Sequence, residues 1–97
     1  MSVVIVGGHD RMVCQYKKIC KQYHCKAKVF TQMSAQLSKQ MGSPDLFVLF
    51  TNTVSHKMIK CALDEARKSN AQVVRCHTSR GAALIDILKR QASAANA

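Results

Sequence analysis

The chain has 97 residues, 47% of them hydrophobic, and a formal net charge of +10 from 15 Lys and Arg against 5 Asp and Glu. This length predicts a single domain with a modest core, and the lack of any apolar run near the ~20 residues that cross a bilayer excludes a transmembrane helix. The charge favours anionic partners, such as nucleic acid, nucleotides, phosphates, haem propionates or acidic proteins, but indicates nothing about the fold.

The start of the chain and its cysteines indicate the cellular compartment. A strand is expected to begin at residue 3, so we expect no signal peptide and a cytoplasmic location. The five cysteines are odd in number and lack CxxC spacing, which favours free thiols over disulfides or a closed zinc site. They are Cys14, Cys20, Cys25, Cys61 and Cys76.

The first half of the chain predicts two strands and a helix. Residues 3–6 form an apolar β-branched run that ends at Gly7-Gly8, a turn with freedom at positive φ. Asp10 is expected at the N-cap or in the first turn of a helix over about 11–23. Residues 26–30 alternate polar and apolar, which predicts a strand near a sheet edge. Apolar side chains at helical spacing mark the inner face of the helix: Met12, Tyr16, Ile19, Cys20 and Tyr23.

The second half continues the alternation. Ser34 is expected to cap a short helix that ends near Met41. Residues 46–50 are apolar throughout, as a strand buried on both faces should be. A helix from about Ser55 to Ser69, a strand at 72–76 and a helix from Arg80 to about Gln91 follow. We expect a single α/β domain at 1–91 and a flexible C-terminal tail at 92–97.

The order βαβαβαβα predicts a parallel sheet with right-handed crossovers. We expect four parallel strands in the order 2-1-3-4 with helices on both faces. This arrangement resembles a small three-layer domain of the Rossmann or flavodoxin type. So narrow a sheet has exposed edges, which favours pairing into a homodimer.

Polar residues gather where the predicted strands end, and ligands of parallel sheets bind at those carboxyl ends. Backbone N–H groups of the glycine turn, the donors of the loop after residue 50 and the Arg80 guanidinium suit an anion. The acidic ribose ligand of a dinucleotide fold is missing after the second strand, where Thr31-Gln32 follows, so NAD and FAD are disfavoured. The predicted ligand-binding residues are Gly7, Gly8, His9, Asp10, Thr51, Asn52, Thr53, Ser55, His56, Ser79 and Arg80.

The same strand ends carry three histidines, His9, His56 and His77. Three imidazoles with an open position are typical of a catalytic zinc, and a haem iron would need one of them, or Cys76, as axial ligand. Because three adjacent strand tips span about 10 Å, convergence on one metal ion requires the loops to bend. Cys76 is alternatively a buried strand thiol without a ligand role.

Three segments, VVIVGGHD, DLFVLFTNTVSHK and VVRCHTS, together resemble a family of small bacterial domains of unknown function, of the DUF2325 type. The resemblance covers Val3 to about Leu88. Positions that match are Gly7, Gly8, His9, Asn52, Ser55 and His56. It implies a compact α/β domain and no particular activity.

The sequence therefore predicts a non-enzymatic module that binds an anionic ligand, haem or a transition metal at the strand ends and acts as a sensor or adaptor. One alternative is a nucleic-acid-binding protein that uses its basic surface, with affinity that falls steeply with salt. Another is a small hydrolase or transferase. A nucleophile such as Ser55 or Cys76 would then need a histidine and Asp10 in reach, but no spacing signature supports this.

Overall fold

The computed structural model describes residues 2–32, 36–42, 44–78 and 80–96, and shows four β-strands alternating with helices. Each strand has five residues. The strands are β1 (Ser2–Val6), β2 (Lys26–Phe30), β3 (Leu46–Phe50) and β4 (Gln72–Cys76). The helices are the 3-10 turn η1 (Asp10–Met12), α1 (Val13–Gln22), α2 (Leu37–Met41), α3 (His56–Ser69) and α4 (Gly81–Asn96).

The four strands form one parallel sheet in the order β2-β1-β3-β4, as the sequence predicts. The register is continuous across the sheet, because Ile5 of β1 lies between Val29 of β2 and Val48 of β3. Val48 in turn pairs with Val74 of β4. The result is a small α/β domain of the Rossmann or flavodoxin type, with β1 and β3 inside and β2 and β4 at the edges.

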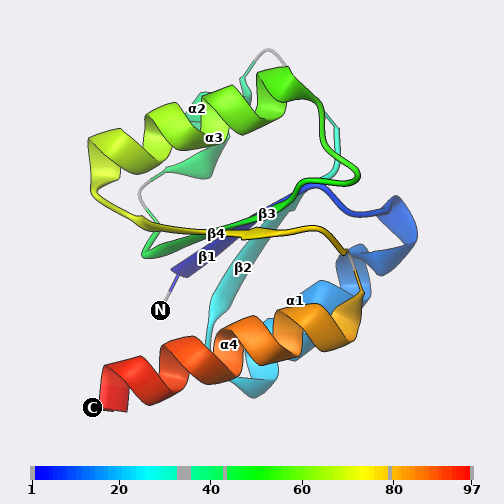
Figure 1. Ribbon diagram of the computed structural model, residues 1–97, viewed down its shortest axis with the longest axis vertical. Helices are drawn as coiled ribbons and strands as arrows, with labels where there is room; N and C mark the ends of the chain where they lie inside the picture. The colour runs from blue at the N-terminus through cyan, green and yellow to red at the C-terminus, as the bar shows by residue number, and fades with distance from the viewer. Residues whose placement is uncertain (1, 33–35, 43, 79, 97) are drawn as a thin grey trace.

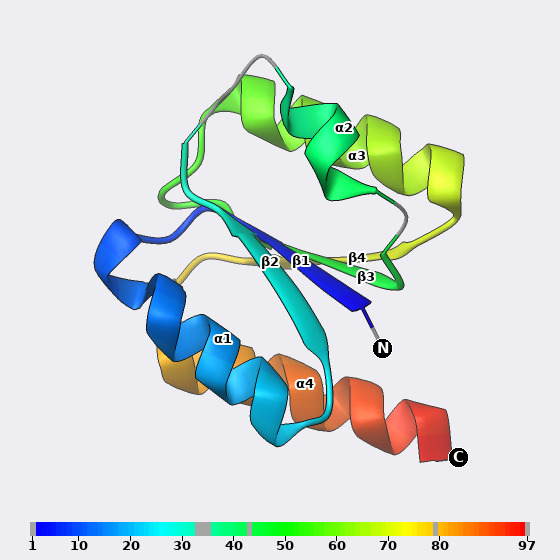
Figure 2. The same ribbon diagram turned by 180° about the vertical axis from the view of Figure 1, so that it is seen from behind.

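Helices cover both faces of the sheet, α1 and α4 on one and α2 and α3 on the other (Figures 1 and 2). Since side chains of a strand alternate between faces, each central strand supplies both cores. Ile5 and Val48 face α1 and α4, where Tyr16 and Leu84 are buried. On the other face Val4, Val6, Phe47 and Leu49 pack with Leu37, Met41, Met58 and Ala62.

Helix boundaries differ from the expectation at three places. The helix expected over 11–23 begins as the 3-10 turn η1 and becomes α-helical at Val13. The helix α2 begins at Leu37, and its expected cap Ser34 lies outside the described residues. The last helix continues beyond Gln91 to Asn96, since the alanine-rich segment after Gln91 has high helix propensity.

Within the described residues, no helix is long and apolar enough to cross a membrane.

Candidate functional site

Polar segments follow all four strands at one end of the sheet, here called the carboxyl rim. They are residues 7–12 after β1, which include η1, 31–32 after β2, 51–56 after β3, which end on the first residue of α3, and 77–78 and 80 after β4. The rim is the end of the sheet at which α1, α3 and α4 begin (Figure 1). The predicted site residues in the described part of the chain lie on these segments, except Cys76, which is the last residue of β4. They share one rim because all the strand pairs are parallel. Ser79, another predicted ligand residue, lies outside the described residues.

The Gly7-Gly8 turn is shaped by close packing. Both glycines are buried and have positive φ, +103° and +86°. A Cβ at Gly7 would lie 2.9 Å from the Phe50 carbonyl oxygen, and a Cβ at Gly8 would lie 2.8 Å from the Tyr16 ring. Neither position therefore accepts a side chain without rearrangement of its neighbours.

The amides of this turn already have partners. The Gly7 N–H donates to the Phe30 carbonyl at 2.8 Å, and the Gly8 N–H donates to Thr53 Oγ1 at 2.6 Å. The Gly8 amide, which the sequence analysis assigns to an anionic ligand, is thus directed to the loop after β3. The turn joins three strand ends, and a ligand would have to contact residues beyond it.

The loop after β3 uses three hydroxyls to hold the rim together. Thr51 Oγ1 donates to the Cys76 carbonyl at 3.3 Å, and Thr53 Oγ1 donates to the Phe50 carbonyl at 3.2 Å. Ser55 caps α3, since its Oγ accepts a hydrogen bond from the Met58 N–H at 3.4 Å. This density of polar residues predicts ligand binding, but each of the three hydroxyls makes a structural hydrogen bond. Asn52 and His56 are exposed on the same loop.

Asp10 is held by the end of β2. Its carboxylate accepts hydrogen bonds from Thr31 Oγ1 and, at 3.4 Å, from Gln32 Nε2. Asp10 was expected at the N-cap or in the first turn of the helix; it lies in the first turn, that of η1, and His9 is the N-cap. Thr31 and Gln32 were given no site role. The strand order contained the signal, because β2 lies beside β1 and its last residues meet the turn after β1.

An open groove of about 550 Å³ lies at the start of η1, lined by His9, Asp10, Arg11 and Met12. The sequence analysis included His9 and Asp10 but not Arg11 or Met12. His9 and Arg11 are exposed, and the Asp10 carboxylate is occupied by Thr31 and Gln32. The groove therefore presents an imidazole and a guanidinium, groups that bind anions.

The N-terminus of α4 lies on the same face of the sheet as this groove. A Cβ at Gly81 would lie 2.7 Å from Nε2 of Gln15, so α4 begins in contact with α1. Arg80 precedes Gly81 and is exposed, and its carbonyl accepts the Ala83 N–H at 3.1 Å. The backbone of Arg80 therefore lies next to the contact between α4 and α1.

The three rim histidines, His9, His56 and His77, are all exposed. They lie at the carboxyl rim but on different loops, and His77 Nδ1 is 3.2 Å from Thr51 Oγ1. Over the described ranges, no three His, Cys, Asp or Glu side chains are grouped closely enough to hold a metal ion. A three-imidazole zinc site within one chain thus gains no support from the arrangement.

The thiols near the core are poor nucleophiles. Burial, with Cys25 nearby as a second cause, raises the pKa of Cys20 from 9.0 to about 11. Burial and then the carboxylates of Glu65 and Asp64 raise the pKa of Cys61. Since the thiolate is the reactive form, neither cysteine is activated. Cys76 is half-buried, and its Sγ donates to the Thr78 carbonyl at 3.2 Å.

The fold and this rim define a class: a small, three-layer, parallel α/β domain with a polar edge at its strand carboxyl ends. A family model matches residues 2–91, nearly the whole chain. The chain belongs to this family, DUF2325, which is described as an uncharacterized protein conserved in bacteria. No curated protein and no solved structure matches the chain.

Proposed function

We propose that this domain is a non-enzymatic, cytoplasmic binding module for an anionic small molecule. The ligand would dock in the groove at the start of η1, with His9 and Arg11 as its main contacts and Arg80 as a third. The observation that carries the proposal is the groove itself, about 550 Å³ in volume and lined by His9, Asp10, Arg11 and Met12. A net charge of +10 would raise the rate at which an anion reaches it.

The hydrogen bonds of the rim favour binding over catalysis. Ser55, the serine considered as a nucleophile, uses its oxygen to cap α3. Thr53 bridges Gly8 and Phe50, and the Asp10 carboxylate is bound by Thr31 and Gln32. The hydrolase or transferase alternative would need these groups to exchange structural bonds for catalytic ones. A binding module would keep these structural hydrogen bonds. A ligand that contacts both η1 and α4 would link the two elements, which is how a sensor or adaptor would respond to it.

The test uses thermal unfolding with inorganic phosphate and, separately, ADP as probes, because a ligand that binds the folded state raises the melting temperature. Arg11→Gln and His9→Gln should each weaken binding by about tenfold or more, since a hydrogen bond to a charged group contributes about 1.5–3 kcal/mol. Arg67→Gln on α3 is the control, because it removes the same charge from an exposed site outside the groove. Equal losses from Arg11→Gln and Arg67→Gln would contradict a site at η1.

Haem is a second candidate ligand, because one axial imidazole is enough for it. His9 and Met12 line the same groove, and both residue types serve as haem ligands. Titration with ferric haem should then produce a Soret band that His9→Ala abolishes and His24→Ala, an exposed control histidine, retains. A transition metal would need ligands from more than one loop or chain, and metal analysis of the purified protein tests that case.

We propose a homodimer that forms through β4. This strand is the edge opposite β2, its Val73 and Val74 are half-buried, and Arg75 is its one charged residue. β2 carries two exposed lysines, which oppose pairing with an identical edge. Light scattering should give twice the 10.7 kDa of one chain, and a monomer across the micromolar range would refute the dimer.

A further inference from the structure

A groove of about 570 Å³ runs along the open edge of β2, and it is lined by basic side chains from three elements. Among the described residues, β1 is the strand that pairs with β2, and no strand pairs with its other edge. Lys17 comes from α1, Lys28 from β2 and Lys39 from α2, and all three are exposed. The other lining residues are Ala27, Val29, Phe30 and Gln40. We call this surface the lysine groove.

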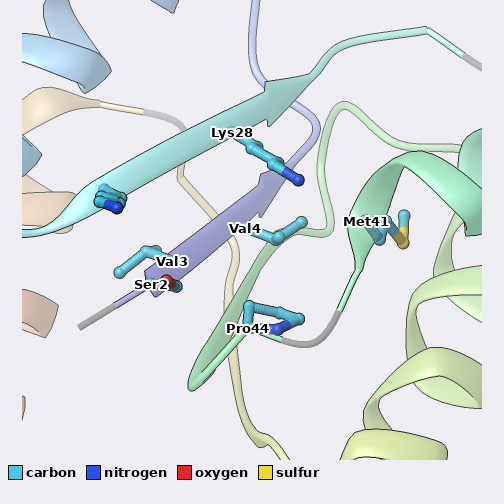
Figure 3. Close-up of a pocket in the computed structure, with 7 residues that line it drawn as sticks. Ser2, Val3, Val4, Lys28, Met41 and Pro44 are labelled. Carbon is cyan, nitrogen blue, oxygen red and sulfur yellow. The ribbon is translucent and has the colours of Figure 1, made fainter.

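Lys28 of the lysine groove is bonded to α2. Its Nζ donates to the Gln40 carbonyl at 3.1 Å, so α2 fixes the position of the ammonium group. Lys28 also lines a second cavity of about 280 Å³, together with Ser2, Val3, Val4, Lys26, Met41 and Pro44 (Figure 3). Figure 3 shows the Lys28 side chain extending from β2 toward α2. Lys26 thus adds a fourth ammonium group two residues before Lys28.

Carboxylates do not offset these charges. Within the described part of the chain, neither cavity is lined by an Asp or Glu. Asp10 is bound by Thr31 and Gln32 at the carboxyl rim, and Asp45 accepts the Ser2 N–H at 2.8 Å. The three ammonium groups of the lysine groove therefore stand without a salt bridge among the described residues.

Lysines on an edge strand also protect it from pairing with other chains, but that role does not account for the whole groove. Lys17 and Lys39 belong to helices and add nothing to the strand's own edge. The charge is therefore concentrated beyond what edge protection requires.

We infer that the lysine groove binds the sugar–phosphate backbone of a nucleic acid. Repeated phosphates match ammonium groups placed on three neighbouring elements, and each phosphate contact releases bound counterions. The aromatic side chain in the groove, Phe30, is half-buried and packs against the core beneath α2 and α3. It offers no platform on which bases could stack. Recognition is therefore independent of base sequence and distinct from the anion site at η1.

The test measures binding of a fluorescein-labelled 20-base-pair duplex by anisotropy from 50 to 200 mM salt. The variant Lys17→Gln/Lys28→Gln/Lys39→Gln removes three charges from the lysine groove. The control Lys60→Gln/Arg67→Gln/Lys89→Gln removes three exposed charges from α3 and α4. Each phosphate contact contributes about 0.9 to the slope of log K against log salt. The groove variant should therefore lose about 2.7 units of slope and at least about tenfold in affinity at 100 mM salt, and the control should match the wild-type slope within about 1 unit.

Folding and alternative occupants are checked in the same series. Thermal melts verify that both triple variants fold. The double variant Lys17→Gln/Lys39→Gln keeps the Lys28 bond to α2. Its salt slope should fall by about two thirds of the decrease seen in the groove variant, because it lacks two of the three charges. A duplex of unrelated sequence should bind equally well.

Four results would overturn the inference. The wild-type protein could fail to bind the duplex at 50 mM salt, or the two triple variants could lose equal affinity for it. The protein could bind vesicles containing 30% phosphatidylserine more tightly than the duplex, or the groove variant could self-associate while its duplex affinity stays unchanged.

Discussion

The strands β3 and β2 are each five residues long and each end in phenylalanine, yet they have opposite surroundings. All of β3 is buried, because it has a strand on either side and helices on both faces. In β2 every residue is exposed or half-buried, and two of the five are lysines. The difference lies in position within the sheet. A central strand contributes stability, whereas an edge strand keeps its charges available for partners.

The same contrast holds for the loops. The turn after β1 and the loop after β3 are joined by the Gly8–Thr53 hydrogen bond, and their small residues serve packing. The groups free for a ligand lie further out, at His9 and Arg11 of the η1 groove and along the lysine groove. The residues that link the two central loops are thus used for packing, and the side chains that we propose as ligand contacts lie outside these bonds.

The largest expected effect compares the two phenylalanines. Phe50→Ala should destabilise the protein by about 3–5 kcal/mol, since the side chain is fully buried and its ring lies 5.3 Å from that of Tyr16. Phe30→Ala, the matched edge variant, should cost only about 1–2 kcal/mol because its side chain is only partly buried. Urea denaturation gives both values. Equal losses would mean that edge and centre do not differ as described.

A smaller effect separates packing from backbone strain. Gly8→Ala should cost about 2–5 kcal/mol, the sum of a positive-φ penalty and overpacking against Tyr16. Gly42 is the control: its φ is +64°, but its nearest neighbour to a new Cβ is Lys28 Nζ at 3.7 Å. The Gly42 ψ of −141° lies outside the left-handed helical region, so Gly42→Ala should show a backbone strain penalty alone, about 1–3 kcal/mol. If chemical denaturation gives the same loss for both glycines, the Tyr16 contact does not limit the turn.

The smallest effect concerns two threonines on one loop. Thr53→Val removes the acceptor of the part-buried Gly8 N–H and should cost about 1–3 kcal/mol. Thr51→Val removes a bond to the Cys76 carbonyl, which still accepts the Thr51 N–H at 2.9 Å, and should cost about 0.5–1.5 kcal/mol. Unfolding free energies in urea test the order. The reverse order would show that the link from β3 to the edge strand β4 matters more than the link between the central loops.

The sequence predicted that the strand-end loops lie at one rim, but it did not predict the hydrogen bonds between them. The strand order put the glycine turn and the loop at 51–56 at one rim, and this holds in the structure. Their hydrogen bonds could not be deduced, because Gly8 and Thr53 are 45 residues apart and meet only after two crossovers. For the same reason Thr31 and Gln32 were not recognised as partners of Asp10.

The sequence by itself determined the four strands, the helices between them and the parallel order 2-1-3-4, because hydrophobic periodicity and crossover handedness are local or general constraints. The net charge of +10 also follows from the sequence alone. Only the tertiary structure decided which of these charges lie together. The lysine groove forms because α1 and α2 bring Lys17 and Lys39 to the open edge beside Lys28, and no spacing along the chain encodes that meeting.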